Sequence, residues 1–255
     1  AWGFLTAIAL LILVVPRITR RPREGALAPS VVDPRLCTGC NQCPVDCPWE
    51  AITMVKRDDD RPTLVALVNP ARCVSCGICA GSCAPMGVGP PGRTGRDQLA
   101  HLREKVIPEI AGSNRIVAVC CEQGPAAFPA VLRSRGAFVH PVSCVGNLHS
   151  SVVERLLREG SSGVIVYGCA ARDCTSREGP KWLAERLFND REAELPARVD
   201  RRRVRIGTVA YGEVAAASRV FDEFARELSL LELPGARLEA EEEPVCEPVA
   251  LEAET

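Results

Sequence analysis

The feature that most constrains this chain is a pair of closely spaced cysteine runs in its first third. Each run has three cysteines separated by two residues, and a fourth cysteine follows after three more residues. The runs consist of Cys37, Cys40, Cys43 and Cys47, and of Cys73, Cys76, Cys79 and Cys83. Three thiolates at this spacing wrap one side of an iron–sulfur cubane, which needs four thiolates in all. Zinc and disulfides are the alternatives, but four-cysteine zinc sites usually pair two C-x2-C knuckles.

Both runs resemble those of bacterial-type two-cluster [4Fe–4S] ferredoxins, and Pro48 follows the first run as it does in that family. Ala84 departs from the family, which has a proline after the last cysteine as well. In such ferredoxins the fourth cysteine of each run ligates the other cluster. The resemblance therefore implies a first cluster on Cys37, Cys40, Cys43 and Cys83, and a second on Cys73, Cys76, Cys79 and Cys47. Because the clusters replace most of the hydrophobic core in so small a unit, we expect the apo form to be largely unfolded.

The first fifteen residues, AWGFLTAIALLILVV, carry no charge. As a helix they would be about 22 Å long, which is shorter than the ~30 Å covered by the ~20 residues that span a bilayer. A signal peptide would have its basic residues before the apolar stretch, whereas here they follow it, at Arg17, Arg20, Arg21 and Arg23. We therefore expect residues 1–16 to be the last part of a transmembrane helix that anchors the chain at the cytoplasmic face of the cell membrane. A buried core helix is the alternative.

Composition divides the rest of the chain into five segments. A basic linker (17–32) precedes the ferredoxin unit (33–88), in which residues 51–55 and 64–68 alternate like short strands. The next segment (89–114) contains the end of a flexible Gly/Pro-rich connector, residues 87–95, and a helix over 97–109. An α/β domain (115–233) and an acidic tail (234–255), which we expect to be disordered, complete the chain. The net charge of −1 does not point to nucleic acid as a partner.

From residue 115 onward, predicted strands alternate with predicted helices. The strands are 115–120, 137–142, 163–167 and 203–209, and the helices are 126–135, 148–158, 178–189 and 213–231. This alternation predicts a parallel sheet of about four strands with helices on both faces. Pro141 lies inside the second strand, so we expect that strand at an edge or ending there. The predicted fold is thus an α+β ferredoxin-like two-cluster domain plus an α/β parallel-sheet domain, with a partial N-terminal transmembrane helix.

More cysteines follow the strands of this predicted sheet. They are Cys120 and Cys121 at the end of the first strand, Cys144 after the second, Cys169 after the third, and Cys174. Because the carboxyl ends of parallel strands lie along one edge, we expect these thiols to converge there as a [2Fe–2S] site. Gly146 and Gly168 would let the backbone approach the cluster and donate N–H bonds to its sulfurs. Structural buried cysteines and a redox-active disulfide are the alternatives.

Residues 115–231 resemble the iron–sulfur delta subunit of methyl-viologen-reducing hydrogenases. The matching features are the Cys120-Cys121 doublet, Cys144-Val145-Gly146, Gly168-Cys169 and Asp173-Cys174. The family carries a [2Fe–2S] cluster, and its pattern has a further cysteine where Gly124 stands here and a histidine where Thr175 stands. With these departures, the resemblance implies Cys121, Cys144, Cys169 and Cys174 as ligands, with Cys120 as a substitute.

We therefore expect a non-catalytic electron-transfer subunit of a membrane-associated redox complex. The resemblance implies a hydrogenase or a heterodisulfide-reductase-like flavoprotein as the soluble partner. The apolar start resembles the end of a cytochrome b-type membrane subunit, which would supply a quinone or haem site. The alternatives are a redox-sensing or docking module with a thiol/disulfide switch, and a flavin- or nucleotide-binding enzyme, although no G-x-G-x-x-G follows the first strand of the α/β domain.

Overall fold

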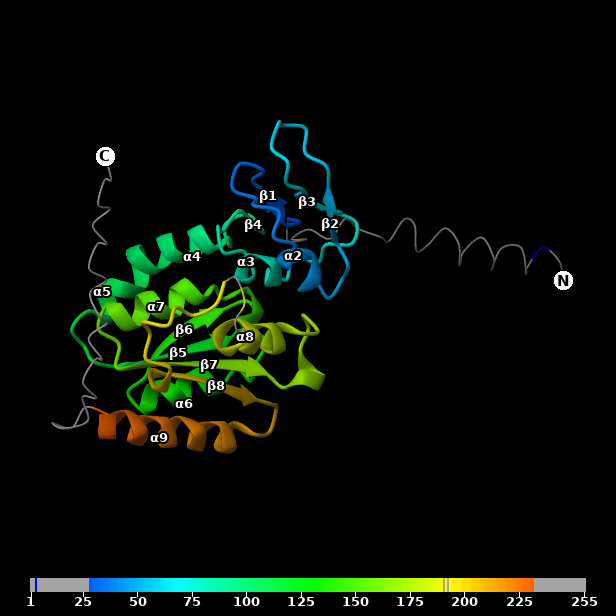
Figure 1. Cartoon of the computed structure of the whole chain (residues 1–255). Helices are drawn as coiled ribbons and strands as arrows, with labels where there is room; N and C mark the ends of the chain where they lie inside the picture. Colours follow the sequence, from blue (N-terminus) through cyan, green and yellow to red (C-terminus); the bar gives the residue numbers. More distant parts are fainter. Residues whose placement is uncertain (1–2, 4–27, 190, 192, 232–255) are drawn as a thin grey trace, which may run out of the picture.

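A computed structural model describes residues 3, 28–189, 191 and 193–231. The predicted transmembrane segment (1–16), most of the basic linker and the acidic tail (234–255) lie outside the described residues, apart from Gly3. Within the described part of the chain, no helix is both long and apolar enough to cross a membrane. The chain forms two packed parts, the cysteine-run part and an α/β domain beneath it in the view of Figure 1.

The α/β domain is built on a parallel four-stranded sheet, as predicted. Its strands are β5 (Ile116–Cys121), β6 (Phe138–Val142), β7 (Gly163–Cys169) and β8 (Val204–Val209). They are hydrogen-bonded in the order β6-β5-β7-β8, so β6 is an edge strand. The edge position that Pro141 predicts is confirmed, because proline cannot donate to a second neighbouring strand.

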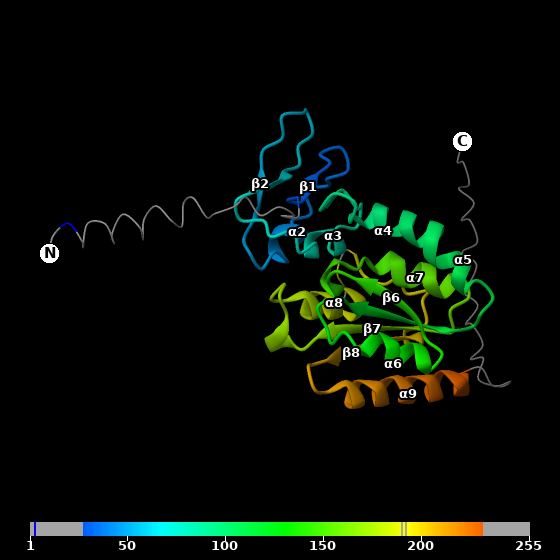
Figure 2. The ribbon, with the colours of Figure 1, turned by 180° about the vertical axis from the view of Figure 1, so that it is seen from behind.

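Helices cover both faces of this sheet, as Figures 1 and 2 show. On one face lie α4 (Gly95–His101), α7 (Ser150–Arg158) and α8 (Gly179–Phe188), and on the other lie α6 (Phe128–Ser134) and α9 (Val214–Leu231). Side chains of β5 alternate between two cores. Val117 and Val119 pack in the α7 core, which includes Leu156, whereas Ala118 and Cys120 pack in the α9 core.

The helix predicted at 97–109 is part of a longer helical segment. It consists of α4, a π-helical turn (Leu102–Val106) and α5 (Ile107–Ile110). Thr94 begins it with a capping box, in which its hydroxyl accepts from the Asp97 N–H and the Asp97 carboxylate accepts from the Thr94 N–H. Leu102, Val106 and Ile110 are fully or almost fully buried in the α7 core. This segment therefore joins the α/β domain to the cysteine-run part.

The prediction of a flexible connector over 87–95 is wrong. Strand β4 (Val88–Gly89) pairs antiparallel with β1 (Val31–Val32), and residues 87–90 are buried. Ser30 is also buried and contacts cysteine sulfurs, so the cysteine-run part begins before the predicted boundary at residue 33. After the buried residues 87–90 the chain makes a tight turn, in which the Arg93 N–H donates to the Pro90 oxygen at 3.0 Å and Pro91 and Gly92 are exposed.

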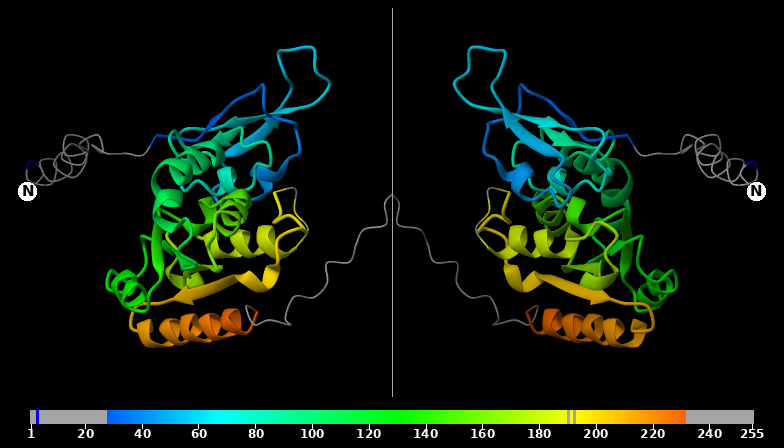
Figure 3. Two further views of the ribbon diagram at one scale, coloured as in Figure 1. Left: turned by 90° about the vertical axis from the view of Figure 1, so that its left-hand side faces the viewer. Right: turned by 90° about the vertical axis from the view of Figure 1, so that its right-hand side faces the viewer.

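Two further strands and two short helices complete the cysteine-run part. Strands β2 (Ile52–Val55) and β3 (Val65–Val68) form an antiparallel pair, close to the predicted strands. Helices α2 (Gln42–Val45) and α3 (Ile78–Gly81) lie within the two cysteine runs. Its small core includes the cysteines themselves alongside Ile52, Ala66 and Val88. The turn between β2 and β3 projects away from the α/β domain, at the opposite end from α9 (Figure 3).

Candidate metal centres

The two cysteine runs share one backbone path. Positive φ angles occur at three pairs of equivalent positions: Gly39 (82°) and Ser75 (61°), Asn41 (64°) and Gly77 (81°), and Glu50 (48°) and Met86 (58°). Left-handed residues turn the chain sharply, and they occur here between or just after cysteines. The repeat noticed in the sequence therefore extends to the local conformation, and it curls each run around a centre.

Four of the predicted ligands line one cavity, the first cubane site. They are Cys37, Cys40 and Cys43 of the first run together with Cys83 of the second. Met54, Ala66 and Val88 contribute apolar walls to this cavity. The structure thus brings the fourth cysteine of the second run to the first three cysteines of the other run.

The other four predicted ligands line the second cubane site. Cys47 of the first run meets Cys73, Cys76 and Cys79 of the second around one cavity. Trp49, Ile52 and Ile78 complete its walls. Four soft thiols around an enclosed apolar space are the donor set that iron–sulfur clusters take, so both cavities fit a [4Fe–4S] group. Among the residues that the structure describes, no group of three or more His, Cys, Asp or Glu side chains is arranged so that it could hold a single metal ion.

Burial favours the protonated form of several of these thiols as long as no metal is bound. It raises the pKa of Cys76 to about 11 and that of Cys79 to about 12, and it raises the pKa of Cys43 further. Metal ligation requires thiolates, so loading iron must release protons and supply the compensating positive charge. Burial and ligation are therefore coupled in this part of the chain.

Backbone amides already point at several sulfurs. The Ala51 N–H donates to the Cys47 sulfur at 3.4 Å, and the Gly87 N–H donates to the Cys83 sulfur at 3.2 Å. These two bonds occupy equivalent positions after the two runs. Such N–H···S bonds stabilise negative charge on sulfur and are one of the determinants of cluster potential.

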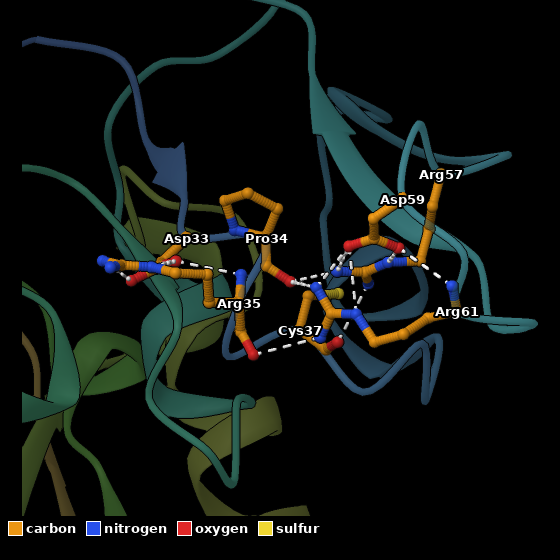
Figure 4. Close-up of polar contacts among 7 residues, drawn as sticks. All are labelled: Asp33, Pro34, Arg35, Cys37, Arg57, Asp59 and Arg61. Atoms are coloured by element: carbon orange, nitrogen blue, oxygen red, sulfur yellow. Dashed lines mark hydrogen bonds and ion pairs between the residues drawn. The ribbon is translucent and has the colours of Figure 1, made fainter.

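A pair of arginines holds the loop that carries the first ligand (Figure 4). Arg57 donates to the carbonyl oxygen of Cys37 at 3.1 Å and to that of Pro34, and Arg61 donates to the Pro34 oxygen at 2.9 Å. Asp59 lies between the two guanidinium groups, which hold the pKa of its carboxyl well below the usual range. In the sequence these residues were only a charged turn between two strands. Their role depends on a contact with a segment about twenty residues earlier in the chain, which local patterns do not reveal.

The predicted third set of thiols also converges. The sulfurs of Cys121 and Cys169 are 3.4 Å apart. A Cβ atom added to Gly179 would lie 2.7 Å from the Cys144 sulfur and 3.7 Å from the Cys174 sulfur. These four residues, the edge thiols, lie where the chain order reverses between β5 and β7, which is the usual ligand position in an open parallel sheet.

Cys120, predicted as a substitute ligand, is not among the edge thiols. Neighbouring residues of a strand point to opposite faces, and Cys120 packs in the α9 core. The nearest polar contact of its sulfur is the carbonyl oxygen of Ala118 at 3.8 Å, and burial raises its pKa to about 12. Cys121 lies against the α7 core on the other face. The alternation of side chains along β5 therefore distinguishes Cys121 from Cys120, a choice that the sequence left open.

Two of the edge thiols, Cys121 and Cys169, share one proton through a hydrogen bond. The Cys169 thiol donates to the Cys121 sulfur, and this bond lowers the pKa of Cys121 to about 6 and raises that of Cys169. Burial raises the pKa of Cys144, while hydrogen bonds from the Ser176 side chain and the Gly146 N–H act in the opposite direction.

The two predicted glycines differ in what they contact. Gly146 has the expected N–H bond to the Cys144 sulfur, and a Cβ on it would also lie 2.6 Å from the Gly179 Cα. Gly168 instead permits close packing, because its Cβ would lie 2.9 Å from the Pro180 ring. Gly146 therefore donates a hydrogen bond to the Cys144 sulfur and is also a point of close contact between two segments.

The segments that carry the edge thiols pack against the segments that carry the second cubane site. Cys144 is near enough to Cys76 to contribute to its raised pKa, after burial. From the loop after Cys174, Arg177 stacks on the Trp49 ring at 3.8 Å and donates to the Pro48 oxygen at 3.0 Å. Further bonds across the boundary are those from Asn147 to the Gly77 oxygen (3.0 Å) and between His149 and the Cys83 oxygen (3.2 Å). The two parts thus meet through the segments that carry the cysteines.

Comparison with protein families assigns both parts of the chain. Residues 36–87 match the family described as a 4Fe-4S dicluster domain, and residues 116–232 match the delta subunit of methyl-viologen-reducing hydrogenase. No curated protein sequence matches the chain. Both resemblances predicted from the sequence, and their order, are confirmed. The cysteine-run part thus matches a 4Fe–4S dicluster domain, and the α/β domain that follows it matches the delta subunit of methyl-viologen-reducing hydrogenase.

Proposed function

We propose that this protein is an electron-transfer subunit of a redox complex that holds two [4Fe–4S] clusters and one [2Fe–2S] cluster. Cys37, Cys40, Cys43 and Cys83 hold the first [4Fe–4S] cluster, and Cys47, Cys73, Cys76 and Cys79 hold the second. The edge thiols Cys121, Cys144, Cys169 and Cys174 hold the [2Fe–2S] cluster. When bound, such clusters supply reversible one-electron redox chemistry.

The observation that carries this proposal is the contact between thiol sites from different domains. Each cubane site draws cysteines from both runs, and the loop that carries Cys144 packs against the second run through Asn147, which donates to the Gly77 oxygen at 3.0 Å. A metal-storage or purely structural role would not need the edge thiols to meet the second cubane site. A relay does need neighbouring sites at a fixed short separation.

The chain's own residues bind, bury and orient in this function. Buried thiols exclude water from the metal, and the N–H groups of Ala51 and Gly87 stabilise charge on sulfur. Arg57 and Arg61 keep the Cys37 loop in place. No side chain needs to act as an acid, a base or a nucleophile, because electron transfer depends on proximity and tuned potentials.

We further propose that the complex is membrane-associated. The support is the charge-free segment 1–15 with the arginines that follow it, a pattern typical of a membrane helix ending on the cytoplasmic side. A hydrogenase or a heterodisulfide-reductase-like flavoprotein would be the soluble partner, and a cytochrome b-like subunit the membrane partner. Full-length protein should sediment with lipid vesicles and a chain lacking residues 1–16 should not; equal behaviour of the two would refute the anchor.

The first test is iron and sulfide per chain on anaerobically purified protein, together with low-temperature EPR. We expect about ten irons, with a [2Fe–2S] signal beside two interacting [4Fe–4S] signals. Cys121→Ser should remove about two irons and the [2Fe–2S] signal. Cys120→Ser is the matched control, since its thiol points to the opposite face, and it should keep both. A [2Fe–2S] signal that survives Cys121→Ser would contradict the assignment.

One observation favours a second candidate, a thiol/disulfide switch. The sulfurs of Cys121 and Cys169 are in contact at 3.4 Å, and a disulfide between them would form with the release of two electrons and two protons to an external disulfide oxidant. About eight irons with only [4Fe–4S] signals, and two thiols lost on oxidation with a disulfide such as oxidised glutathione, would establish this switch in place of the [2Fe–2S] cluster. The α/β domain would then be a docking module with a redox switch.

A further inference from the structure

Arg186 is the largest fully buried side chain in the described structure, and it lies between the two parts of the chain. It belongs to α8 of the α/β domain. Its guanidinium donates to the Ser82 hydroxyl at 3.1 Å and to the Gly146 carbonyl oxygen at 2.6 Å. It also lies 3.7 Å from the carboxylate of Asp46, whose side chain is completely buried. The Arg186 guanidinium thus connects the end of α2, the end of α3 and the loop after β6.

This buried cluster carries more positive than negative charge. Asp46 accepts a hydrogen bond from Ser82 at 2.5 Å and also pairs with Arg191, so two guanidinium groups share one carboxylate. The Nε atoms of Arg186 and Arg191 are buried without a hydrogen-bond partner among the described residues. A buried charge that is only partly compensated is unfavourable for folding, and an apolar residue often serves stability better. Another anion nearby would remove that penalty.

The anions in reach are the sulfur sites. Asp46 immediately precedes Cys47 of the second cubane site, and Gly146 follows two residues after Cys144. The sulfurs of Cys79 and Cys144 are close enough to Arg186 to act on it electrostatically. One of them belongs to the second cubane site and the other to the edge thiols. Arg186 is therefore a fixed cation between these two sites.

We propose that Arg186 is a positioning residue that holds the second cubane site and the edge thiols together and raises the reduction potential of the second cluster. A cluster becomes more negative by one charge when it is reduced, so a buried cation beside it favours the reduced form. Asp46 acts in the opposite direction, because it places a negative charge next to the same cluster. This inference rests on the proposed function, since it requires a redox-active cluster on Cys47, Cys73, Cys76 and Cys79.

The test is an anaerobic EPR-monitored redox titration of the full chain with its clusters. Arg186→Gln removes the charge but keeps a polar N–H donor, on a side chain that is two bonds shorter. We expect it to shift the reduction equilibrium of the second cluster toward the oxidised form by at least about tenfold, or about 59 mV for one electron. Asp46→Asn should shift the same equilibrium in the opposite direction. Arg186→Lys, which keeps the charge, should titrate close to the wild type.

Two controls make the result specific. Arg198→Gln removes an exposed arginine that pairs with Glu154 on the α/β domain, and it should leave the potential unchanged. Cys47→Ser, which should lack the second cluster, identifies which wave of the titration belongs to it. If Arg186→Gln fails to fold, Asp46→Asn carries the sign test: it must shift the equilibrium toward the reduced form, and a shift toward the oxidised form would overturn the inference.

Two outcomes would overturn the inference: shifts of the same sign in Arg186→Gln and Asp46→Asn, or potentials that neither substitution moves. General loosening of the junction would shift the potentials without regard to the sign of the removed charge. Failure of the proposed function would look different, because the wild-type protein itself would then show no reversible [4Fe–4S] signals. The two failures are thus distinguished by the wild-type titration alone.

Discussion

Replacing Gly146 by alanine tests whether the two parts of the chain form a rigid junction. Gly146 is buried where the loop after β6 meets the start of α8 and the α3 helix. A Cβ there would lie 2.6 Å from the Gly179 Cα, 3.1 Å from the Gly179 oxygen and 2.8 Å from a side-chain carbon of Ile78. Two of these three contacts are with backbone atoms, so no change of rotamer can relieve them.

The size of the effect follows from these distances. Carbon atoms prefer separations of about 3.5–4.0 Å, so the loop and α8 must move apart by roughly 1 Å. Overpacking of this kind typically costs about 1–3 kcal/mol. For a protein of this size that corresponds to a decrease in Tm of about 2–12 °C. The same displacement would lengthen the bond from Arg186 to the Gly146 oxygen, now 2.6 Å.

The measurement is anaerobic thermal unfolding of the cluster-loaded protein, followed by circular dichroism. Gly124→Ala is the matched control, because its Cβ would lie 3.3 Å from the Cys121 oxygen and 3.5 Å from Val209, which are nearly ordinary contacts. We expect it to lower Tm much less. A Gly146→Ala protein that melts with the wild type, or no lower than Gly124→Ala, would refute the reasoning that the junction is close-packed.

Three further predictions concern the ligands, their support and pH. Cys47→Ser should remove the second [4Fe–4S] EPR signal and spare the first; loss of the first would refute the crossed ligation. Arg57→Gln removes donors to the Cys37 loop, so a chelator should extract iron from the first site several-fold faster, with the second site as internal reference. Burial lowers the pKa of His140 from 6.5 to about 4, and its neutral form is therefore favoured on folding. The unfolding free energy should thus decrease by about 1 kcal/mol from about pH 6.5 to about pH 5.5, and His140→Asn should abolish this part of the decrease in denaturant titrations.

The cysteine runs and the strand–helix alternation predicted which cysteines line each cavity and the architecture of the α/β domain. The C-x2-C-x2-C-x3-C runs imply their crossed partners through the ferredoxin resemblance, and the structure places Cys83 and Cys47 accordingly. Alternating strands and helices predicted the parallel sheet, and Pro141 predicted the edge strand. The spacing within each run and the alternation within each segment are local patterns, and the long-range arrangement followed from the resemblance and from the packing rules of parallel sheets.

Composition was a poor guide in the stretch around residues 87–95. A proline- and glycine-rich sequence describes a flexible linker and a tight turn equally well. What makes this stretch ordered is the pairing of β4 with β1, whose partner lies near residue 31 and before the first cysteine run. The pairing could not be read from either segment alone.

The sequence by itself determined which chemistry this protein performs, because thiol spacing dictates what can be ligated. Only the tertiary structure decided how the sites are arranged. It separated Cys121 from Cys120 by the face of the sheet, and it placed the buried charges of Arg186 and Asp46 beside the second cubane site. Asp46 and Arg186 belong to different domains, and nothing in their local sequences relates them. Their contact exists because folding packs α8 against the cysteine runs, and the burial that follows is what gives these charges their effect.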